Sequence, residues 1–198
     1  MYLLTETASP FALERWAAFF ANFGQFAKGF FYTLGISIGA LIVALLLGLI
    51  FGAMSSTHNK VLRGISRVYV EIFQNTPLLV QFVVVFYGIS ILTDGHIMIP
   101  ISLTAILCVG VYTGAYISEI IRTGIDAVPK GQTEAALSQG FTYADTMRII
   151  ILPQAVRTIL PPLTNQVVNL IKNTSTVAII SGADIMFTAK AWAYDTTN

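Results

Sequence analysis

The chain has few charged residues and a single cysteine. Only 11% of its 198 residues are Asp, Glu, Lys or Arg, whereas about a quarter of the residues of a soluble domain are charged. So few charges cannot cover the surface of a water-soluble fold. The single cysteine, Cys108, excludes a disulfide within the chain and a cysteine-based metal site, and we interpret it as a small hydrophobic residue. The net charge of +1 gives no reason to expect a nucleic-acid partner.

The sequence also lacks the residue patterns that carry catalysis. It contains no GxxxxGK[ST] phosphate-binding loop, so the chain is not expected to hydrolyse ATP by itself. His58 and His96 lie in different loops without partners at metal-ligand spacing, which predicts no metal site. No nucleophile and base stand at a spacing that indicates an active site. We therefore expect neither an enzyme nor a cofactor in this chain.

Long hydrophobic runs are what the sequence has in abundance. Hydrophobic residues make up 55% of it, and its mean hydropathy is +0.73. A helix needs about 20 apolar residues to cross a bilayer. We therefore predict a single all-α membrane domain over 1–198 with four spans, at 30–54, 68–92, 101–121 and 149–171. Prolines at 153, 161 and 162 are expected to break the last span.

The segment before the first span has an aromatic face. Its large rings recur at spacings of three or four residues: Trp16, Phe19, Phe20, Phe23 and Phe26. This spacing predicts an interfacial helix over 11–28, the alternative being a helix packed on the bundle. Since no basic segment and short apolar run precede it, the N-terminus is not expected to be a cleaved signal peptide.

Basic residues indicate the orientation in the membrane. Seven lie in the 55–67 and 122–157 regions, against four on the other side of the predicted spans. Because cytoplasmic loops carry the excess of Lys and Arg, this bias places both regions in the cytoplasm and the N-terminus outside.

The 122–157 region contains a mildly polar segment, for which we predict a surface helix over 131–145. Ala135 and Ala136 are small enough to let another surface approach closely, and Glu134 near the helix start suits the helix dipole. Gly140 permits a bend. These properties alone leave a docking helix and a plain surface connector equally possible.

The motif in this region resembles the cytoplasmic motif of membrane subunits of bacterial ABC importers. The matching residues, with every spacing met, are Glu134-Ala135-Ala136, Gly140, Ile150, Leu152 and Pro153. Further segments resemble the polar amino acid permease branch, of histidine and glutamine type: Asn75–Gln81, Ser118–Ile120 with Arg122, Ala127–Gln132, Leu152–Ala155 and Asn173–Ser175. The resemblance covers roughly residues 25–190. Thr123, where the family commonly has Gly, and Leu137-Ser138-Gln139 depart from the pattern.

The resemblance implies the type I transmembrane-domain fold of ABC importers, with a cytoplasmic coupling helix and about four of the five spans usual in the family. It implies a second permease subunit, identical or related, two cytoplasmic ABC ATPases that bind ATP and Mg²⁺, and an extracytoplasmic amino-acid-binding protein. The location implied is the bacterial inner membrane. The residues implied to couple to the ATPase are Gly131, Glu134, Ala135, Ala136, Gly140, Leu152 and Pro153.

Polar residues within the predicted spans are candidates for the transport path, since polar groups in lipid must face protein or water. Asn165, Asn169 and Asn173 recur every four residues and form one stripe on a helix. We hypothesise that this stripe, with Thr113 and Glu119, lines the path of a zwitterion. Alternatively, the amides join helices at about 1 kcal/mol or less each, and Glu119 pairs with Arg122 one turn on.

The sequence therefore favours a permease of an ATP-driven importer of polar amino acids. One alternative is a permease for another small polar solute. The other, from a different class, is a self-contained channel or proton-coupled carrier, for which Glu71 and Glu119 are the candidate ionisable groups.

Overall fold

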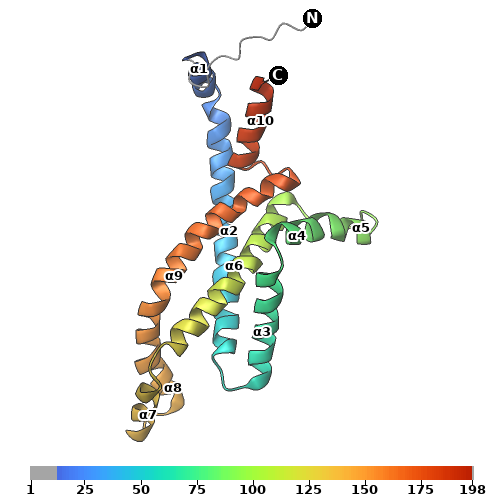
Figure 1. Cartoon of the computed structure of the whole chain (residues 1–198). Helices are drawn as coiled ribbons and strands as arrows, with labels where there is room; N and C mark the ends of the chain where they lie inside the picture. The colour runs from blue at the N-terminus through green and yellow to red at the C-terminus, as the bar shows by residue number, and fades with distance from the viewer. Residues whose placement is uncertain (1–12, 198) are drawn as a thin grey trace, which may run out of the picture.

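The computed structural model describes residues 13–197, and over this range the chain is built from helices joined by short turns (Figure 1). In chain order these are α1 (Leu13–Ala21), α2 (Phe23–Ser55), α3 (Lys60–Asn75), α4 (Leu78–Val83), the π-helical η1 (Val84–Gly88), α5 (Ile89–Leu92), α6 (Ile101–Asp126), α7 (Lys130–Ser138), α8 (Tyr143–Asp145), the π-helical η2 (Thr146–Ile151), α9 (Leu152–Asn173), the 3-10 helix η3 (Thr174–Ile180) and α10 (Ile185–Thr197).

Two of these helices, α2 and α6, are long and apolar enough to cross a membrane by themselves. The bent pair formed by α3 and the stretch Leu78–Leu92 makes a third if it counts as one span. Four spans were expected, and the one over 149–171 is not among those found in the described residues. The reason lies in the composition of α9, which carries Arg157, Lys172 and three asparagines among its apolar residues.

The N-terminal segment is two helices rather than the single helix expected over 11–28, of which residues 11 and 12 lie outside the described range. The chain turns at Asn22, whose side-chain nitrogen donates to the carbonyl of Ala18 at 2.9 Å. Phe19 of α1 contacts Trp192 of α10, with ring centroids 6.1 Å apart. Trp16 and Phe20 are exposed. The aromatic face is thus divided between packing on α10 and an open surface.

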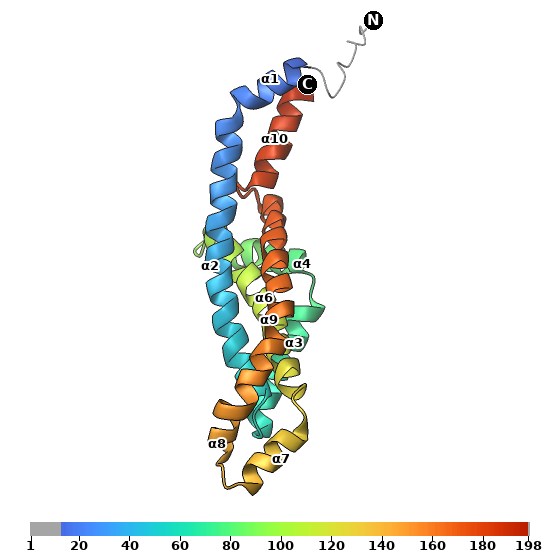
Figure 2. The same cartoon turned by 90° about the vertical axis from the view of Figure 1, so that its left-hand side faces the viewer.

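The helix α2 is the longest element, and α3, α6, α9 and α10 all pack against it. Its 33 residues span about 50 Å at 1.5 Å per residue, against about 30 Å for the hydrocarbon core of a bilayer. The helix α10 runs beside its N-terminal part (Figure 2). A Cβ on Gly29 of α2 would lie 3.1 Å from the Cα of Ile185, so the two helices meet at a glycine.

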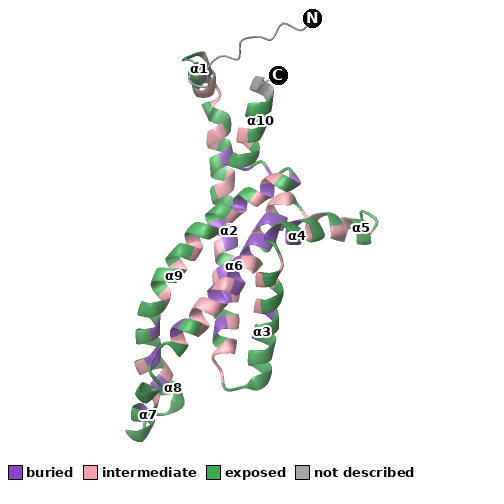
Figure 3. Ribbon diagram, in the orientation of Figure 1, coloured by how far each residue is buried: buried purple, intermediate pink, exposed green. Residues whose placement is uncertain are grey.

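The main hydrophobic core lies where α2 and α6 cross. It contains Ile36, Ala40 and Ala44 of α2 packed with Ala105 and Val109 of α6, all at most 3% exposed. Figure 3 shows the buried residues concentrated along α6. Small residues on both helices allow the backbones to approach closely, as is common in membrane helix pairs.

The second predicted span, 68–92, is not one straight helix. The chain bends by 98° between α3 and the stretch Leu78–Leu92, and α4 and α5 point away from the bundle in Figure 1. Thr76 is extended, with φ −99° and ψ 123°, as is favoured for the residue before a proline. Pro77 has no N–H to continue the helix. The predicted span over 68–92 therefore corresponds to a bent pair of helices, and that it crosses the membrane stays a prediction.

The prediction that Pro161 and Pro162 break the last helix was wrong. The helix α9 continues from Leu152 to Asn173 with Pro161 and Pro162 inside it. Pro153 is the second residue of α9, and the chain before it takes the wider π-helical form of η2. A π-helical turn shifts the hydrogen-bond pattern by one residue, so the missing N–H of Pro153 does not interrupt the helical path.

Candidate functional site

The segment that carries the importer-like motif lies at the end of the molecule opposite the described termini. It consists of α7, α8 and η2, and the turn between α2 and α3 lies at the same end (Figures 1 and 2). His58 from that turn meets Tyr143 of α8 edge to face, with ring centroids 5.0 Å apart. Two stretches expected on the cytoplasmic side thus lie at one end of the molecule.

The helix α7 turns one small residue inward and leaves its other motif residues outside. Ala136 is 3% exposed, whereas Gly131, Glu134 and Ala135 are not buried. The backbone carbonyl of Glu134 accepts a hydrogen bond from the hydroxyl of Ser138 at 2.8 Å, which closes the last turn of the helix. The outer face is therefore small, weakly polar and open to close approach by another surface.

The helix expected over 131–145 ends at Ser138, which corrects its predicted length. Gly140 has φ +87°, a left-handed conformation that glycine adopts without steric cost. Its N–H donates to the carbonyl of Leu137 at 3.0 Å, and the N–H of Phe141 donates to the carbonyl of Ala136 at 3.2 Å. These two bonds form a Schellman motif, which closes the helix C-terminus. Gly140 is thus the stop signal of α7.

After this stop the chain begins a new helical stretch that leads into α9. The hydroxyl of Thr142 accepts the N–H of Asp145 at 3.2 Å and so caps the start of α8. Leu152 and Pro153 are the first two residues of α9, and both are exposed. All seven residues implied to couple to the ATPase therefore lie in α7, in the turn after it, or at the start of α9.

A second, smaller hydrophobic core supports this surface. Val128, Ile151 and Ala155 are buried in it and separate from the core of α2 and α6. A Cβ on Gly124 of α6 would lie 2.3 Å from Cγ1 of Ile159, so α6 and α9 approach closely beside this core. Next to it is a pocket of about 370 Å³ whose lining includes His58, Lys130, Glu134, Tyr143 and Met147.

The candidate path residues are distributed over two helices. Asn165 and Asn169 of α9 are exposed, and Asn173 at its end is half-buried. Thr113 of α6 is fully buried, and its hydroxyl has no hydrogen-bond partner within residues 13–197. The predicted stripe therefore lies mainly on an open face, whereas Thr113 lies in the interior of the chain.

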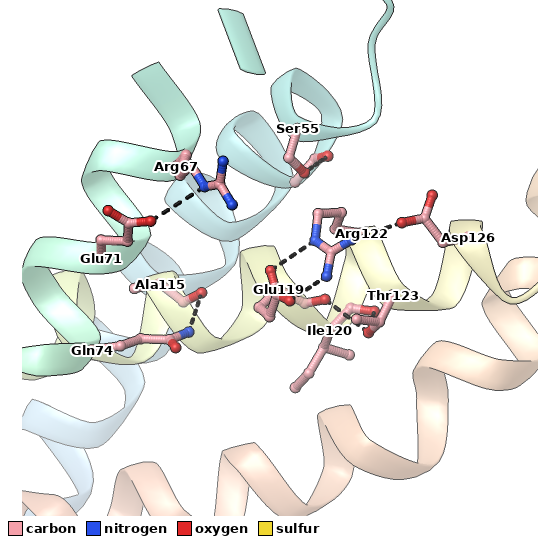
Figure 4. A network of polar contacts seen from close by, with 11 residues as sticks. Ser55, Arg67, Glu71, Gln74, Ala115, Glu119, Ile120, Arg122, Thr123 and Asp126 are labelled. Atoms are coloured by element: carbon pink, nitrogen blue, oxygen red, sulfur yellow. Dashed lines mark hydrogen bonds and ion pairs between the residues drawn. The ribbon is translucent and has the colours of Figure 1, made fainter. Parts of the chain in front are cut away.

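Glu119 is held by an ion pair, as the alternative interpretation expected (Figure 4). Nε of Arg122 donates to Oε2 of Glu119 at 2.9 Å, and a second nitrogen of the same guanidinium donates to Oε1. Arg122 also donates to Asp126 at 2.7 Å. The carboxylate of Glu119 is thus already engaged by its own helix. No group of three or more His, Cys, Asp or Glu side chains in the described range could hold a metal ion.

The polar residues that fasten α3 to α6 had no specific role predicted for them. Tyr69 donates its hydroxyl hydrogen to the carbonyl of Val111 at 2.7 Å. Nε2 of Gln74 donates to the carbonyl of Ala115 at 3.2 Å (Figure 4). The signal for them was the presence of polar side chains in an apolar stretch, because such groups must find partners when they leave water.

The buried carboxyl group of Asp184 was likewise not anticipated. Asp184 lies before α10, and its Oδ1 accepts the N–H of Phe187 at 2.9 Å. The hydroxyl of Thr33 on α2 accepts the N–H of Ile185 at 3.1 Å. Burial raises the pKa of Asp184, and the hydrogen bond from Phe187 opposes that rise. Asp184 and Thr33 together cap α10 and join it to α2.

Comparison with known protein families gives one extended match. The family described as binding-protein-dependent transport system inner membrane component matches residues 44–198. The chain is 41% identical over 173 residues to the probable glutamine ABC transporter permease protein GlnM of Bacillus subtilis (strain 168), covering 86% of this chain and 77% of that protein. It is 35% identical over 187 residues to the glutamate/aspartate import permease protein GltJ of Escherichia coli (strain K12), covering 85% and 76%.

Solved structures show the same fold. A crystal structure of an amino acid ABC transporter with histidines superposes with a TM-score of 0.84 at 32% identity, covering 92% of this chain and 84% of that one. An inward-facing structure of the MetNI methionine ABC transporter gives 0.72 at 18% identity, covering 90% and 84%, and supports the fold alone. The transmembrane-domain fold of ABC importers, predicted from the sequence motif, is confirmed.

Proposed function

The chain belongs to the family of binding-protein-dependent transport system inner membrane components, and from that premise we propose that it is the permease subunit of an ATP-driven importer of polar amino acids. The observation that carries the proposal is the exposed face of α7. This helix ends at the left-handed Gly140 and packs on η2, whose Ile151 lies in the small core. The relatives named for glutamine, glutamate and aspartate transport support the substrate class.

In this proposal α7 docks into a groove of a cytoplasmic ATPase. Gly131, Glu134 and Ala135 face that partner, because they lie on the open side of α7. Ala136 faces inward and seats the helix on its own subunit. Gly140, Leu152 and Pro153 set the path of the chain from α7 into α9. ATP and Mg²⁺ bind to the ATPase, and this chain transmits the resulting motion to its membrane helices.

The complete transporter contains a second permease subunit, identical or related, two ATPases and an extracytoplasmic amino-acid-binding protein. The N-terminus lies outside the cell and α7 in the cytoplasm. Lys60 and Arg63 at the start of α3 lie at the same end as α7 (Figure 1), which agrees with the rule that cytoplasmic loops are rich in basic residues.

The transport path runs along α9. Asn165 and Asn169 offer exposed amides, and an amide can donate to a carboxylate and accept from an ammonium group. Asn173 continues the stripe at the end of the helix. Thr113 and Glu119 are weaker candidates, since the first is buried and the second is engaged by Arg122. That engagement also argues against Glu119 as the proton carrier of a self-contained transporter.

Reconstitution tests the proposal. The chain is co-expressed with the ATPase and binding-protein genes of its locus, purified and placed in liposomes with a panel of amino acids. We expect co-purification with the ATPase, and ATP-dependent uptake stimulated by the loaded binding protein. Uptake driven by a proton gradient without ATP would instead establish a self-contained carrier. Stimulation only by a solute other than an amino acid would establish a different substrate class.

A pair of matched variants tests the docking face. Ala135→Trp adds a large side chain to the exposed face of α7, whereas Ala21→Trp adds one to an exposed position at the end of α1. We expect Ala135→Trp to lose the ATPase during purification and Ala21→Trp to retain it. Retention of the ATPase by both variants would contradict docking through α7.

A further inference from the structure

The bend between α3 and α4 leaves the last carbonyls before it, among them those of Phe73 and Thr76, without their helical partners. In a continuous helix the carbonyl of Phe73 would accept the N–H of residue 77, and that of Thr76 the N–H of residue 80. Residue 77 is a proline and has no N–H. The N–H of Val80 donates instead to the carbonyl of Pro77 at 2.9 Å. An unpaired carbonyl is unfavourable within a bilayer, so the bend needs donors from elsewhere.

The side chain of Gln81 supplies a donor to both of these carbonyls. Its Nε2 donates to the carbonyl of Phe73 at 3.2 Å and to that of Thr76 at 2.9 Å. Gln81 lies in α4, beyond the bend, and is 7% exposed. The amide therefore replaces two of the backbone donors that the bend has removed, and it does so from the far side of the break.

The other polar side chains at the bend act differently. Asn75 donates to the carbonyl of Glu71, and the hydroxyl of Thr76 donates to that of Ile72, so both bond within the last turns of α3. Gln74 reaches across to α6 rather than to α4. Among the hydrogen bonds of the described side chains, those of Gln81 alone join α4 to the end of α3.

We propose that Gln81 is the positioning residue of this bend: its amide holds α4 across the end of α3 and, with the packing of Leu78 and Phe82 in the main core, fixes the direction of the arm Leu78–Leu92. Oε1 of Gln81 is buried without a partner in the described part of the chain, so the amide serves here as a donor. A carboxylate in place of the Gln81 amide would have only acceptor oxygens, which would be repelled by the carbonyl oxygens of Phe73 and Thr76.

The direction of the arm bears on transport, a consequence that rests on the proposed function. The arm leaves the bundle sideways (Figure 1) and carries exposed apolar residues such as Val84, Ile91 and Leu92. Leu78 and Phe82 hold the start of the arm in the main core, and the Gln81 bonds tie it to the end of α3. Without these bonds the angle between the arm and α3 depends on that packing alone and would vary more widely.

A distance between two spin labels measures the bend directly. Labels at Val68 on α3 and Ile91 on α5, both exposed, are introduced into the complex in a Cys108→Ala background. Straightening the bend completely would lengthen their separation by about 10 Å at the helical rise of 1.5 Å per residue. We compare Gln81→Met, which keeps the side-chain length without the donor, with Gln74→Met, which removes an amide bonded to α6 and leaves the bend untouched.

We expect Gln81→Met to broaden the distance distribution and shift it to longer values, and Gln74→Met to keep the wild-type distribution. Pro77→Ala combined with Gln81→Met should give the longest separation, since residue 77 then has an N–H for the carbonyl of Phe73. A wild-type distribution in Gln81→Met overturns the proposal. If that variant does not fold, Gln81→Asn replaces it, because its amide is one carbon too short to reach both carbonyls.

Uptake measurements separate a role of Gln81 in positioning the arm from a general loss of folding or substrate binding. In the reconstituted complex we expect Gln81→Met to lower the maximal uptake rate about tenfold while the KM for the amino acid stays within about twofold. An unchanged maximal rate overturns the role in transport. The label distance needs no substrate, so it still tests Gln81 if the wild-type complex fails to import amino acids and the proposed function falls.

Discussion

Gly48 of α2 lies directly against Ile117 of α6: a Cβ at residue 48 would stand 2.4 Å from Cγ2 of Ile117 and 2.7 Å from its Cβ. Ile117 is 1% exposed and belongs to the main core. Its branched side chain begins at the point of contact, so it cannot swing away to make room. The close contact between α2 and α6 at this point therefore depends on residue 48 having no side chain.

Gly48→Ala should destabilise the subunit by about 1–3 kcal/mol, the usual cost of overpacking a core. A Cβ at Gly35 of the same helix would have no neighbour within 4 Å, and Gly35→Ala should leave stability unchanged or raise it by about 0.5–1 kcal/mol, because alanine is the better helix former. Thermal unfolding in detergent, followed by size-exclusion chromatography, measures both. Equal midpoints for the two variants would contradict the packing described.

Gly140→Val should weaken the coupling of ATP hydrolysis to uptake. A side chain at φ +87° costs about 1–2 kcal/mol, and a Cβ there would have no neighbour within 4 Å, so the cost comes from the backbone alone. Asparagine tolerates this conformation, and Gly140→Asn should keep near-normal coupling. The measurement is the amount of amino acid imported per ATP hydrolysed. If the two variants behave alike, the left-handed turn is not what matters.

Asn169→Leu should reduce uptake at least tenfold while assembly with the ATPase is kept, because an exposed amide on the proposed path is replaced by an apolar group of similar size. Val168→Leu alters the neighbouring exposed position without removing a polar group and serves as the control. Uptake by the reconstituted complexes, normalised to the amount of protein, is the readout. Normal uptake by Asn169→Leu would remove this residue from the path.

Asp184 should make stability depend on pH. Its pKa in the folded chain is raised above the usual 3.8 by burial, so the folded state holds the proton more tightly than the unfolded state. Stability is therefore highest below about pH 4 with respect to this group and falls as pH rises through the raised pKa. Asp184→Asn keeps an acceptor for the N–H of Phe187 but cannot ionise.

The difference in unfolding midpoint between Asp184→Asn and the wild type should thus grow in favour of the variant as the pH rises above about 4 and through the raised pKa. A parallel pair of pH profiles would show that the carboxyl group is not desolvated in the folded chain.

Local features of the fold could be read from the sequence where one residue type decides the backbone. Gly140 was expected to permit a bend, and it ends α7 in a left-handed turn. The pairing of Glu119 with Arg122 followed from their spacing on one helix and was kept open as an alternative. In both cases the interaction involves neighbours in sequence, which a pattern can indicate.

Features that depend on which groups satisfy a freed backbone carbonyl, or on how helices pack, could not be read in this way. Pro77 and the pair Pro161-Pro162 are alike in sequence terms, yet the chain turns by 98° at the first and α9 continues through the others. At Pro77 the side chain of Gln81 donates to the freed carbonyls of Phe73 and Thr76 from beyond the break. The burial of Thr113 likewise depends on how α6 packs, which its own sequence does not specify.

The small core of Val128, Ile151 and Ala155 holds together the end of the subunit that carries α7. It joins the end of α6 to the start of α9 but shares no residue with the core between α2 and α6. A force on α7, if it docks as proposed, would therefore reach α6 and α9 at the same point, because α7 packs on η2 and this core lies where the two helices meet.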